Sequence, residues 1–536
     1  MTVVTNQAEL IAFLSEPKSY GMGVTEVRRI ETHISVVFLA GDRVFKLKKA
    51  VRYPYLDFST LEKRRAACKA EIAVNRRAAP SIYRGVVPLT RAPGGGLALG
   101  GPTTGKAGEP VEWLVEMSRF DEDGLFDRLA RAGALERHRI EELAEIVAGF
   151  HRDADRRTDA DSAANFAQTI AGNAASMELT VMHEKEPRGP ASGAFDRGAI
   201  ARLRELSEAR LASLRGLLDR RRARGLVRRC HGDLHLGNIC LIDGRPVLFD
   251  AIEFNETFAV IDVLYDAAFL VMDLDHLGQR ALAGQFLNRY LDATGDDEGL
   301  AALPLFLSLR AAIRAHVGAT AAYAIKDTGE AARRLAEART YFAEAFAYLQ
   351  PAASRLIAIG GLSGSGKSRL ANELAPWIGT APGARVVRSD VIRKQLAGAR
   401  LHDRLGPEGY TAEMTARTYA ELDNRLEASL RAGRSAIADA VFARPEERER
   451  IVRIARSCGV SFDGLWLEAD QGLMERRLVE RKADVSDATV EVLRSQMSYD
   501  LGDVTWTRID SGGTRDETLA MAFAALALPN RPGNAL

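Results

Sequence analysis

The sequence predicts two differently built parts. The first is an α+β part, in which a small strand-rich lobe precedes a large helical lobe, and the second is an α/β part with a parallel sheet. Short β-branched or aromatic runs separated by Gly and Asp turns fill residues 24–119, which is typical of strands. Apolar residues then recur at helical spacing to residue 350. From residue 351 strand-like runs alternate with helical patterns, and this alternation favours a parallel sheet covered by helices.

Several elements follow from the local pattern. A helix is expected over residues 61–79 and a hairpin loop over the Gly- and Pro-rich residues 92–107. The run ERHRIEELAEIVAGFH predicts an amphipathic helix whose buried face carries Ile140, Leu143, Ile146, Val147 and Phe150. Pro351 marks the expected boundary, which divides the chain into residues 1–350 and 351–536. Within the first part the small lobe is expected over residues 20–120 and the large lobe over 121–350.

The bulk composition indicates a soluble cytoplasmic protein. A chain of 536 residues is long enough for several domains. The formal charge of +1 gives no general attraction to nucleic acid or anionic membranes. Four scattered cysteines argue against a disulfide framework. The N-terminus lacks the pattern of a signal peptide. The most apolar later stretch, residues 303–325, contains Arg310, Arg314 and His316, which favours a buried or amphipathic helix over a membrane span.

The second part opens with a phosphate-binding motif. Residues 361–368, GLSGSGKS, match G-x-x-x-x-G-K-[ST] between a strand-like run and a helical pattern. Glycines allow backbone N–H groups to surround phosphate oxygens, and the following helix N-terminus adds a favourable partial charge. We expect Lys367 to contact the β- and γ-phosphates of ATP and to act in catalysis, and the Ser368 hydroxyl to hold Mg²⁺. The residues expected to bind the nucleotide are Gly361, Ser363, Gly364, Ser365, Gly366, Lys367 and Ser368. The alternative is a Gly-rich strand–helix turn without a ligand.

The remainder of this part resembles small P-loop kinases such as the gluconate and adenylylsulfate kinases and the zeta-toxin group. The resemblance rests on the motif, on SDVIR after the second strand, and on IAD ending another strand. It implies that Asp390 meets the substrate hydroxyl, that Arg393 meets an anionic group of the substrate, and that Asp439 orders Mg²⁺. The alternative for Asp390 is a helix N-cap.

A run of arginines completes the resemblance. In MERRLVERKADVSDA a helix enters a polar loop, which resembles the lid through which such kinases bring arginine to the transferring phosphoryl group. The resemblance implies catalytic roles for Arg477 and Arg481, with Arg476 beside them. An ordinary solvated helix face is the alternative.

A second constellation lies in the first part. HGDLHLGN ends at Asn238 and is followed by LFD, which ends at Asp250. Phosphoryl transfer needs a carboxylate near the attacking hydroxyl and hard oxygen ligands for metal. Asp233 supplies the carboxylate, and Asn238 and Asp250 are the candidate Mg²⁺ ligands. The alternative is a hairpin whose Asp and Asn cap turns.

This loop resembles the H-G-D-x-x-x-x-N signature of the aminoglycoside phosphotransferase and choline kinase group, which has a protein-kinase-like fold. The resemblance implies a phosphate-binding lysine in the strand lobe, paired with a helix glutamate. VFKLKK offers Lys46 and, nearly as well, Lys48 on the same strand face. Glu71 is the preferred partner and Glu62 the weaker one. The upstream residues 151–153, His-Arg-Asp, spell the triplet found in protein kinases. His151 is nevertheless expected to be a structural residue at the end of a helix.

Two further features carry over from the resemblance. Glu116 and Met117 end the strand VEWLVEM, where the hinge backbone would meet adenine. Glu253, Asp262 and Asp266 follow the metal ligands, where relatives place an acidic cleft for cationic substrates; a solvated helix face is the alternative.

Together the two parts resemble the bacterial bifunctional aminoglycoside phosphotransferase/ATP-binding proteins. The resemblance implies an enzyme that uses ATP and Mg²⁺ to phosphorylate a hydroxyl of a small molecule, such as a sugar, an aminoglycoside-like or a nucleoside-like compound. Two alternatives stay open. One domain regulates the other by binding nucleotide, or the second part is a polynucleotide end kinase. The residues available for the latter are Arg385, Arg388, Arg393 and Arg404, a modest basic cluster.

Overall fold

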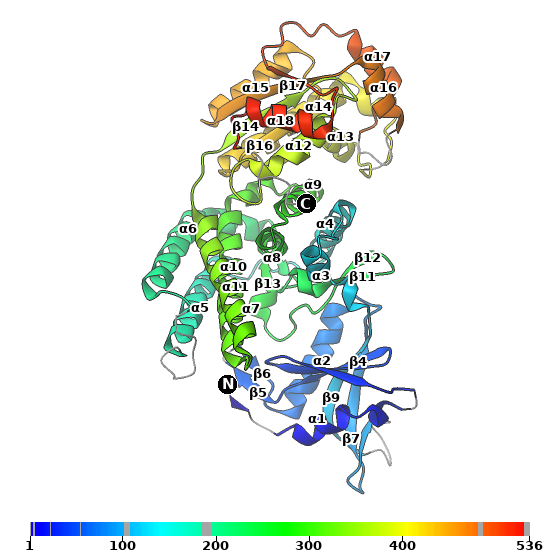
Figure 1. The fold of residues 1–536 in the computed structure, drawn as a ribbon, viewed down its shortest axis with the longest axis vertical. Helices are drawn as coiled ribbons and strands as arrows, with labels where there is room; N and C mark the ends of the chain where they lie inside the picture. Colours follow the sequence, from blue (N-terminus) through cyan, green and yellow to red (C-terminus); the bar gives the residue numbers. More distant parts are fainter. Residues whose placement is uncertain are drawn as a thin grey trace. The chain divides into compact units, whose positions relative to one another are not determined.

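The computed structural model describes residues 2–3, 6–21, 23–53, 55–100, 108–183, 194–401, 403–480 and 486–529. The chain forms two compact units, whose helices and strands are labelled in Figure 1. Unit 1 contains Met1–Phe166 and Leu218–Asp273, and unit 2 contains Ala167–Leu217 and Leu274–Leu536. The helical segments within residues 167–217 and 274–349 therefore group with the α/β part. The expected domain boundary at Pro351 stays a prediction.

Unit 1 begins with an antiparallel sheet whose order, within the described residues, is β2-β3-β4-β9-β7-β8. Its strands are β2 (Val27–Glu31), β3 (Ser35–Ala40), β4 (Arg43–Lys48), β9 (Glu109–Ser118), β7 (Tyr83–Arg91) and β8 (Leu97–Leu99). The short strand β8 lies inside the stretch expected to be wholly a loop. Helix α2 (Leu61–Asn75) packs on this sheet and ends four residues earlier than expected.

The sheet carries a smaller antiparallel hairpin and an outer helix beside it. These are β5 (Val51–Tyr53), β6 (Leu56–Asp57) and α1 (Ala8–Leu14), and β1 (Thr2–Val3) pairs with β5. Alternate residues of the central strands enter the core, so Phe45 and Leu47 are buried on one face of β4. Lys46 and Lys48 therefore share the opposite face, as the period of a strand requires.

The helical lobe of unit 1 holds two short antiparallel strand pairs between helices. Its elements are α3 (Phe126–Arg131), α4 (Arg137–Arg152), β10 (Val227–Arg229), β11 (Ile239–Ile242), β12 (Arg245–Leu248), α7 (Glu256–Ala259), β13 (Val260–Asp262) and the start of α8 (Val263–His276). On α4 the predicted face is confirmed at Ile140, Leu143 and Val147, which are fully buried. His151 lies in the last turn of α4 and is buried, as expected of a structural residue.

Unit 2 begins with long helices. They are the remainder of α5 (Ser162–His183) and α6 (Arg197–Ala223), followed by α9 (Arg280–Thr294), α10 (Leu303–Ala324) and α11 (Thr328–Leu349). Helix α10 packs along α11 and buries most of its length, including Arg310, so the expected buried helix is confirmed. Among the described residues no helix combines the length and the apolar character needed to cross a membrane.

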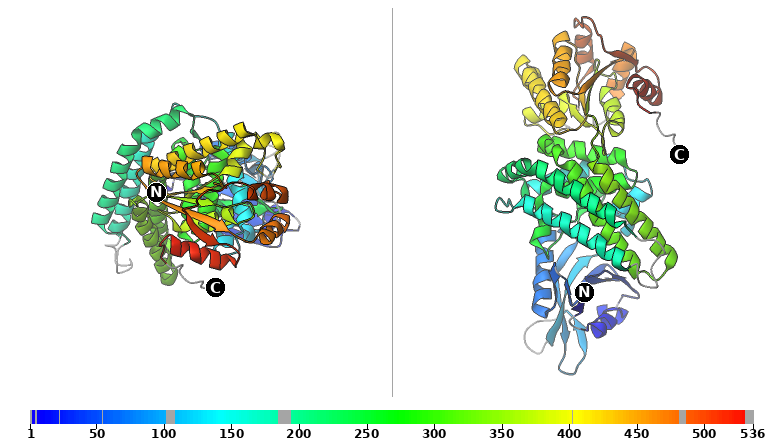
Figure 2. Two further views of the ribbon diagram at one scale, coloured as in Figure 1. Left: turned by 90° about the horizontal axis from the view of Figure 1, so that it is seen from above. Right: turned by 90° about the vertical axis from the view of Figure 1, so that its left-hand side faces the viewer.

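The rest of unit 2 is an α/β fold with a parallel sheet. Within the described residues the order is β15-β16-β14-β17-β18, with every neighbouring pair parallel. The strands are β14 (Arg355–Gly360), β15 (Arg385–Arg388), β16 (Ala436–Asp439), β17 (Ser461–Glu468) and β18 (Thr507–Asp510). The helices are α12 (Lys367–Leu374), α13 (Ser389–Leu396), α14 (Ala412–Arg431), α15 (Pro445–Ser457), α16 (Gln471–Glu480), α17 (Val490–Met497) and α18 (Arg515–Ala525). In the left view of Figure 2 helices lie on both sides of these strands.

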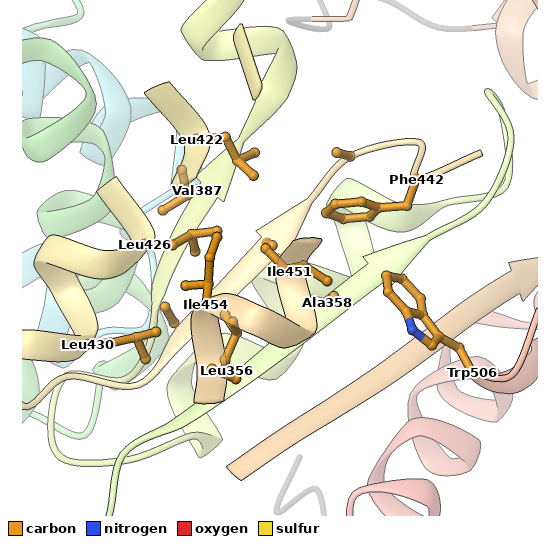
Figure 3. Packing of buried hydrophobic residues seen from close by; sticks show 14 of the residues in the cluster. Leu356, Ala358, Val387, Leu422, Leu426, Leu430, Phe442, Ile451, Ile454 and Trp506 are labelled. Carbon is orange, nitrogen blue, oxygen red and sulfur yellow. The ribbon is translucent and has the colours of Figure 1, made fainter. Parts of the chain in front are cut away.

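The central strand β14 is apolar on both faces because helices cover both. Leu356 and Ala358 face a core built with α14 and α15, which Figure 3 shows together with Ile451, Ile454 and Trp506. Ile357 and Ile359 face a second core built with α12 and α18. All four residues are fully buried, and truncating such an isoleucine to alanine costs about 2–5 kcal/mol. The strand before the phosphate-binding loop is thereby held rigidly.

A buried ion cluster joins the edge strand β15 to the helices of unit 2. Arg385 is almost fully buried, and its guanidinium lies 2.6 Å from Asp297 Oδ1 and 2.8 Å from Asp292 Oδ1. Asn288 Oδ1 accepts a hydrogen bond of 2.8 Å from Val386 N. Asp292 and Asn288 belong to α9, and Asp297 begins the 3-10 helix η4 (Asp297–Ala301). The proposed place of Arg385 in an exposed basic cluster is therefore wrong, because the side chain is an internal structural cation.

Candidate functional sites

The HGDLHLGN loop connects β10 to β11 in unit 1 and presents Asp233 to solvent, with 41% of its side chain exposed. Asn238 Nδ2 donates to Asp233 O at 3.0 Å and to Asp233 Oδ2 at 3.2 Å. The amide nitrogen of Asn238 is thus directed to Asp233, which leaves Oδ1 as the atom able to ligate a cation. Asp233 is held in one orientation by the residue that accompanies it in the motif.

The buried carboxylate of Asp266 holds the backbone of this loop in place. Asp266 is fully buried, and its two oxygens accept hydrogen bonds of 2.9 Å from His231 N and Gly232 N. His151 Nε2 lies 3.1 Å from the same carboxylate. His231 is also buried, which lowers its imidazole pKa, and its Nε2 donates to Phe249 O at 2.9 Å. These contacts fix the peptide units directly before Asp233.

Glu253, Asp262 and Asp266 therefore do not form the expected acidic cleft. Asp266 holds the loop, Asp262 forms a buried two-point ion pair with Arg221 at 2.7 and 2.8 Å, and Glu253 pairs with buried Lys48. The alternative of a solvated helix face is equally wrong, because all three carboxylates are buried or nearly so. A buried carboxylate needs a partner, and in each case this fold supplies one.

The strand lobe places both candidate lysines on one glutamate. Lys46 Nζ lies 2.9 Å from Glu71 Oε1, and Lys48 Nζ lies 2.6 Å from Glu71 Oε2. Lys46 also reaches Asp250 Oδ1 at 2.6 Å, whereas Lys48 turns to Glu253. Burial alone would raise the pKa of Glu71, but the two lysines lower it to about 2. The structure thus brings Lys46, Glu71 and Asp250 together and leaves Lys48 as an internal support.

Asp250 itself adopts an uncommon backbone conformation, with φ at 61°. Such a conformation is strained for a residue with a side chain, although Asp tolerates it better than most. The strain is offset by neighbours: Asp250 N donates to Tyr83 Oη at 3.0 Å, and Ala251 N donates to Asn75 Oδ1 at 2.7 Å. Asn75 lies one turn after Glu71 on α2, so one helix face positions both ends of the network. Asn75 was not predicted from the sequence, although its i+4 spacing from Glu71 was a usable signal.

The hinge candidates end strand β9. Glu116 lies 3.7 Å from Arg43, and Met117 packs into the core beneath the sheet. Phe120, just beyond them, contacts the ring of Phe249, which precedes Asp250. The chain segment that follows β9 therefore lies next to the segment that carries Asp250, and contact of the hinge backbone with adenine stays a prediction.

In unit 2 the GLSGSGKS loop joins central strand β14 to α12, the context that the motif requires. Gly361, Gly364 and Gly366 have φ values of 136°, 83° and 94°, which side chains rarely adopt. A Cβ atom on Gly364 would lie 2.7 Å from Met474 O. Lys367 Nζ donates to Leu362 O at 2.9 Å and so curls over the loop.

Two features of the loop fit a phosphate cradle. The Ser365 hydroxyl is fully buried and has no hydrogen-bond partner among the described residues, which is uncommon for a buried polar atom without a ligand role. Ser363 N donates to Gln496 Oε1 at 2.8 Å, so α17 supports the loop from outside. Gln496 was not predicted, because no local pattern links α17 to a loop more than a hundred residues earlier.

The carboxylates expected beside this loop lie at the carboxyl ends of neighbouring strands. Asp439 ends β16, pairs in register with Ile359 of β14, and accepts a hydrogen bond of 3.2 Å from Arg388 Nε. Asp390 lies in the first turn of α13 and is partly exposed. The N-cap position is Arg388, so the alternative that Asp390 caps the helix is wrong.

The arginines expected to bind substrate or the transferring phosphoryl group differ in burial and in their hydrogen-bond partners. Arg393 is buried, donates to Gly409 O at 2.9 Å and lies over the Tyr410 ring, so contact with substrate would require it to leave these partners. Arg477 donates to Ser511 O at 2.7 Å, and burial together with nearby Arg369 lowers its pKa. Arg476 is exposed, and Arg481 lies outside the described residues. Arg369, on the helix that follows the loop, was not predicted.

Comparisons with known proteins match two separate stretches of the chain to two families. The model of the phosphotransferase enzyme family matches residues 121–303, which include Asp233, Asn238 and Asp250. The model of an AAA domain matches residues 356–499, which include the GLSGSGKS loop. The uncharacterized protein Rv2004c of Mycobacterium tuberculosis is 31% identical over 501 residues, which cover 92% of this chain and 94% of that protein. The uncharacterized protein Mb2027c of Mycobacterium bovis matches to the same extent.

Among solved structures, a choline kinase from Cryptosporidium parvum covers 62% of this chain and 94% of its own, with 12% identity and a TM-score of 0.37. A gluconokinase from Sinorhizobium meliloti covers 33% of this chain and 91% of its own, with 20% identity and a TM-score of 0.25. Likenesses of this extent carry no argument about activity, which rests on the family matches and on the geometry.

Proposed function

The chain belongs to the family that fuses an aminoglycoside phosphotransferase-like kinase domain to a P-loop kinase-like domain, and on this premise we propose that it transfers the γ-phosphoryl group of ATP to small-molecule hydroxyls at two separate sites. That it is an ATP-dependent kinase follows from the two family matches. Kinase families generally use ATP with Mg²⁺. We also propose that the acceptors are small molecules and that each site carries out its own transfer. The two domains are proposed to comprise residues 1–350 and 351–536.

In unit 1 the proposal rests on one observation, the network of Lys46, Glu71 and Asp250 next to a catalytic loop that presents Asp233. Lys46, held by Glu71, would contact the phosphates. Asn238 Oδ1 and the Asp250 carboxylate would hold Mg²⁺, which when bound neutralises developing charge on the phosphoryl oxygens. Asp233 would orient the acceptor hydroxyl and take its proton, and Asn238 holds that carboxylate in position.

In unit 2 the backbone amides of GLSGSGKS would surround the phosphates, and Lys367 would exchange its bond to Leu362 O for the β- and γ-phosphates. The Ser368 hydroxyl and Asp439 would hold Mg²⁺ or its waters. Asp390, at the open carboxyl edge of the sheet, would orient the acceptor hydroxyl, and Arg477 would contact the transferring phosphoryl group.

The test is ³¹P NMR of ATP with pooled sugars, aminoglycosides and nucleosides, using wild type and the variants Asp233→Asn and Lys367→Met. We expect each variant to abolish one set of phosphorylated products and to retain the other, with melting temperatures unchanged. Full phosphoryl transfer by both single variants would refute the assignment of roles.

The alternative of a polynucleotide end kinase loses support from unit 2. Of the arginines that would form its basic groove, Arg385 is buried in an ion cluster, Arg388 pairs with Asp439, and Arg393 is bonded to main chain. The regulatory alternative makes a different prediction, namely ATP binding at one site without turnover at that site under any acceptor.

A further inference from the structure

A row of aromatic rings crosses the surface of unit 1 beside the catalytic loop. We define the aromatic row as His33, Tyr53, Tyr55 and Phe258. The His33 and Tyr53 rings meet edge to face at 6.0 Å, Tyr53 and Tyr55 stack at 5.4 Å with an interplanar angle of 13°, and Tyr55 meets Phe258 at 6.1 Å. The rings thus extend from the turn between β2 and β3, across the β5–β6 hairpin, to α7 in the helical lobe.

The main chain of Phe258, the last residue of the row, packs against the segment that carries Asp233. Phe258 O lies so close to Gly232 that a Cβ atom there would be 2.8 Å away, and Gly232 directly precedes Asp233. Asn255 fixes the other side: its Nδ2 donates to Tyr55 O at 3.1 Å, and its Oδ1 caps α7 through Thr257 N. The rings are therefore positioned by the same backbone that positions the proposed catalytic carboxylate.

The rings remain open to solvent. Tyr55 is 37% exposed and Phe258 is 41% exposed. An aromatic ring of this exposure forgoes much of the free energy that its burial would supply. Adjacent aromatic rings left accessible beside a reaction centre are suited to stack on a planar ring of a ligand.

The charges around the row do not favour a cationic ligand. The nearest acid on α7, Glu256, is paired with Arg229 and with Arg157, the latter at 3.0 Å. The carboxylate of Glu253 forms an ion pair with buried Lys48. Partial burial and the nearby charge of Lys49 lower the pKa of His33, which favours the uncharged imidazole at this end of the row. A polycation would therefore find paired carboxylates here, whereas an uncharged planar ring finds an apolar surface.

We propose that the aromatic row is the acceptor-binding surface of the Asp233 site, and that it takes an uncharged hydroxyl compound carrying a planar ring. The inference rests on the proposed function of unit 1. A ring stacked on Tyr55 and Phe258 would lie beside the segment that precedes Asp233, because the main chain of Phe258 contacts Gly232.

The test uses two matched pairs of probes that differ in a planar ring: p-nitrophenyl against methyl β-D-glucoside, and adenosine against ribose. Binding to the full chain saturated with ADP and Mg²⁺ is followed by saturation-transfer NMR titration. We expect the planar member of at least one pair to bind about tenfold or more tightly, the range of one stacking contact. Phe258→Ala and Tyr55→Ala should remove that preference, while Phe258→Tyr and Tyr55→Phe should keep it.

Tyr499→Ala is the matched control, since Tyr499 is 48% exposed and belongs to unit 2. Equal binding within both pairs, or a preference that survives both alanine variants, would overturn the proposal. Alanine variants that weaken both members equally and lower the melting temperature would also overturn it, because the rings would then merely hold the lobes together. Dependence of phosphoryl transfer on Asp233 is measured separately, so the proposed function can stand while this inference fails.

Discussion

Replacing Arg385 by methionine tests whether the α/β part of unit 2 and its preceding helices form one cooperative structure. The side chain is 1% exposed and lies 2.8 Å or less from carboxylate oxygens of Asp292 and Asp297. Arg385→Met would leave two buried carboxylates without a counter-charge. Breaking a buried pair by removing one partner costs about 3–5 kcal/mol. At about 2–4 °C per kcal/mol for a unit of this size, the melting temperature of unit 2 should fall by about 6–20 °C.

Differential scanning calorimetry of the full chain measures this change. The control is Arg431→Met, which removes an exposed pair with Glu427 of 2.8 Å and should cost about 0–1 kcal/mol. Adding Asp292→Asn and Asp297→Asn to Arg385→Met should restore much of the loss, because the uncompensated charges disappear. A loss for Arg385→Met no greater than that of the control would refute the reasoning.

Three further predictions concern the two sites. Lys46→Met should lower kcat of the unit 1 reaction at least about a hundredfold by removing the cation on the phosphates, whereas Lys48→Met should chiefly lower the melting temperature; equal kinetic effects would show that the lysines were assigned wrongly. Because the pKa of Glu71 is lowered from 4.5 to about 2, its ion pairs stabilise the fold fully above pH 4.5 and lose this contribution as the pH falls towards 2. Glu71→Gln should therefore flatten the acid-induced loss of stability in that window, measured by circular dichroism, and an unchanged slope would contradict the ion-pair account. Gly364→Ala forces a Cβ atom to 2.7 Å from Met474 O at a φ of 83°, and should abolish ATP binding to unit 2 in titration calorimetry while unit 1 still binds; retained binding at both units would mean that the loop tolerates the side chain.

Contiguous sequence patterns predicted the parts of both sites that a single loop builds. GLSGSGKS predicted its strand–loop–helix context, and HGDLHLGN predicted one loop that carries Asp233 and Asn238, which the structure joins by a hydrogen bond. The lysine–glutamate pair was also predictable, because strand periodicity puts Lys46 and Lys48 on one face and a helix follows. In each case the spacing of a few residues determines the geometry.

Contacts distant in sequence could not be predicted in this way. Gln496 supports the phosphate-binding loop from α17, and Asp292 and Asp297 pair with Arg385 from another element. The acidic residues Asp262 and Asp266 looked like a charged cleft because sequence shows a charge but not its partner. The burial and the ion-pair partners of these residues are determined by the tertiary fold, which brings together residues that are distant in sequence.

The most direct test of the central claim, that one chain holds two separate nucleotide sites, is the stoichiometry of AMP-PNP binding with Mg²⁺ in titration calorimetry. The wild type should bind two equivalents, Lys46→Met and Lys367→Met should each bind one, and the double variant should bind none. A single equivalent in the wild type, or one variant that removes both, would contradict the account.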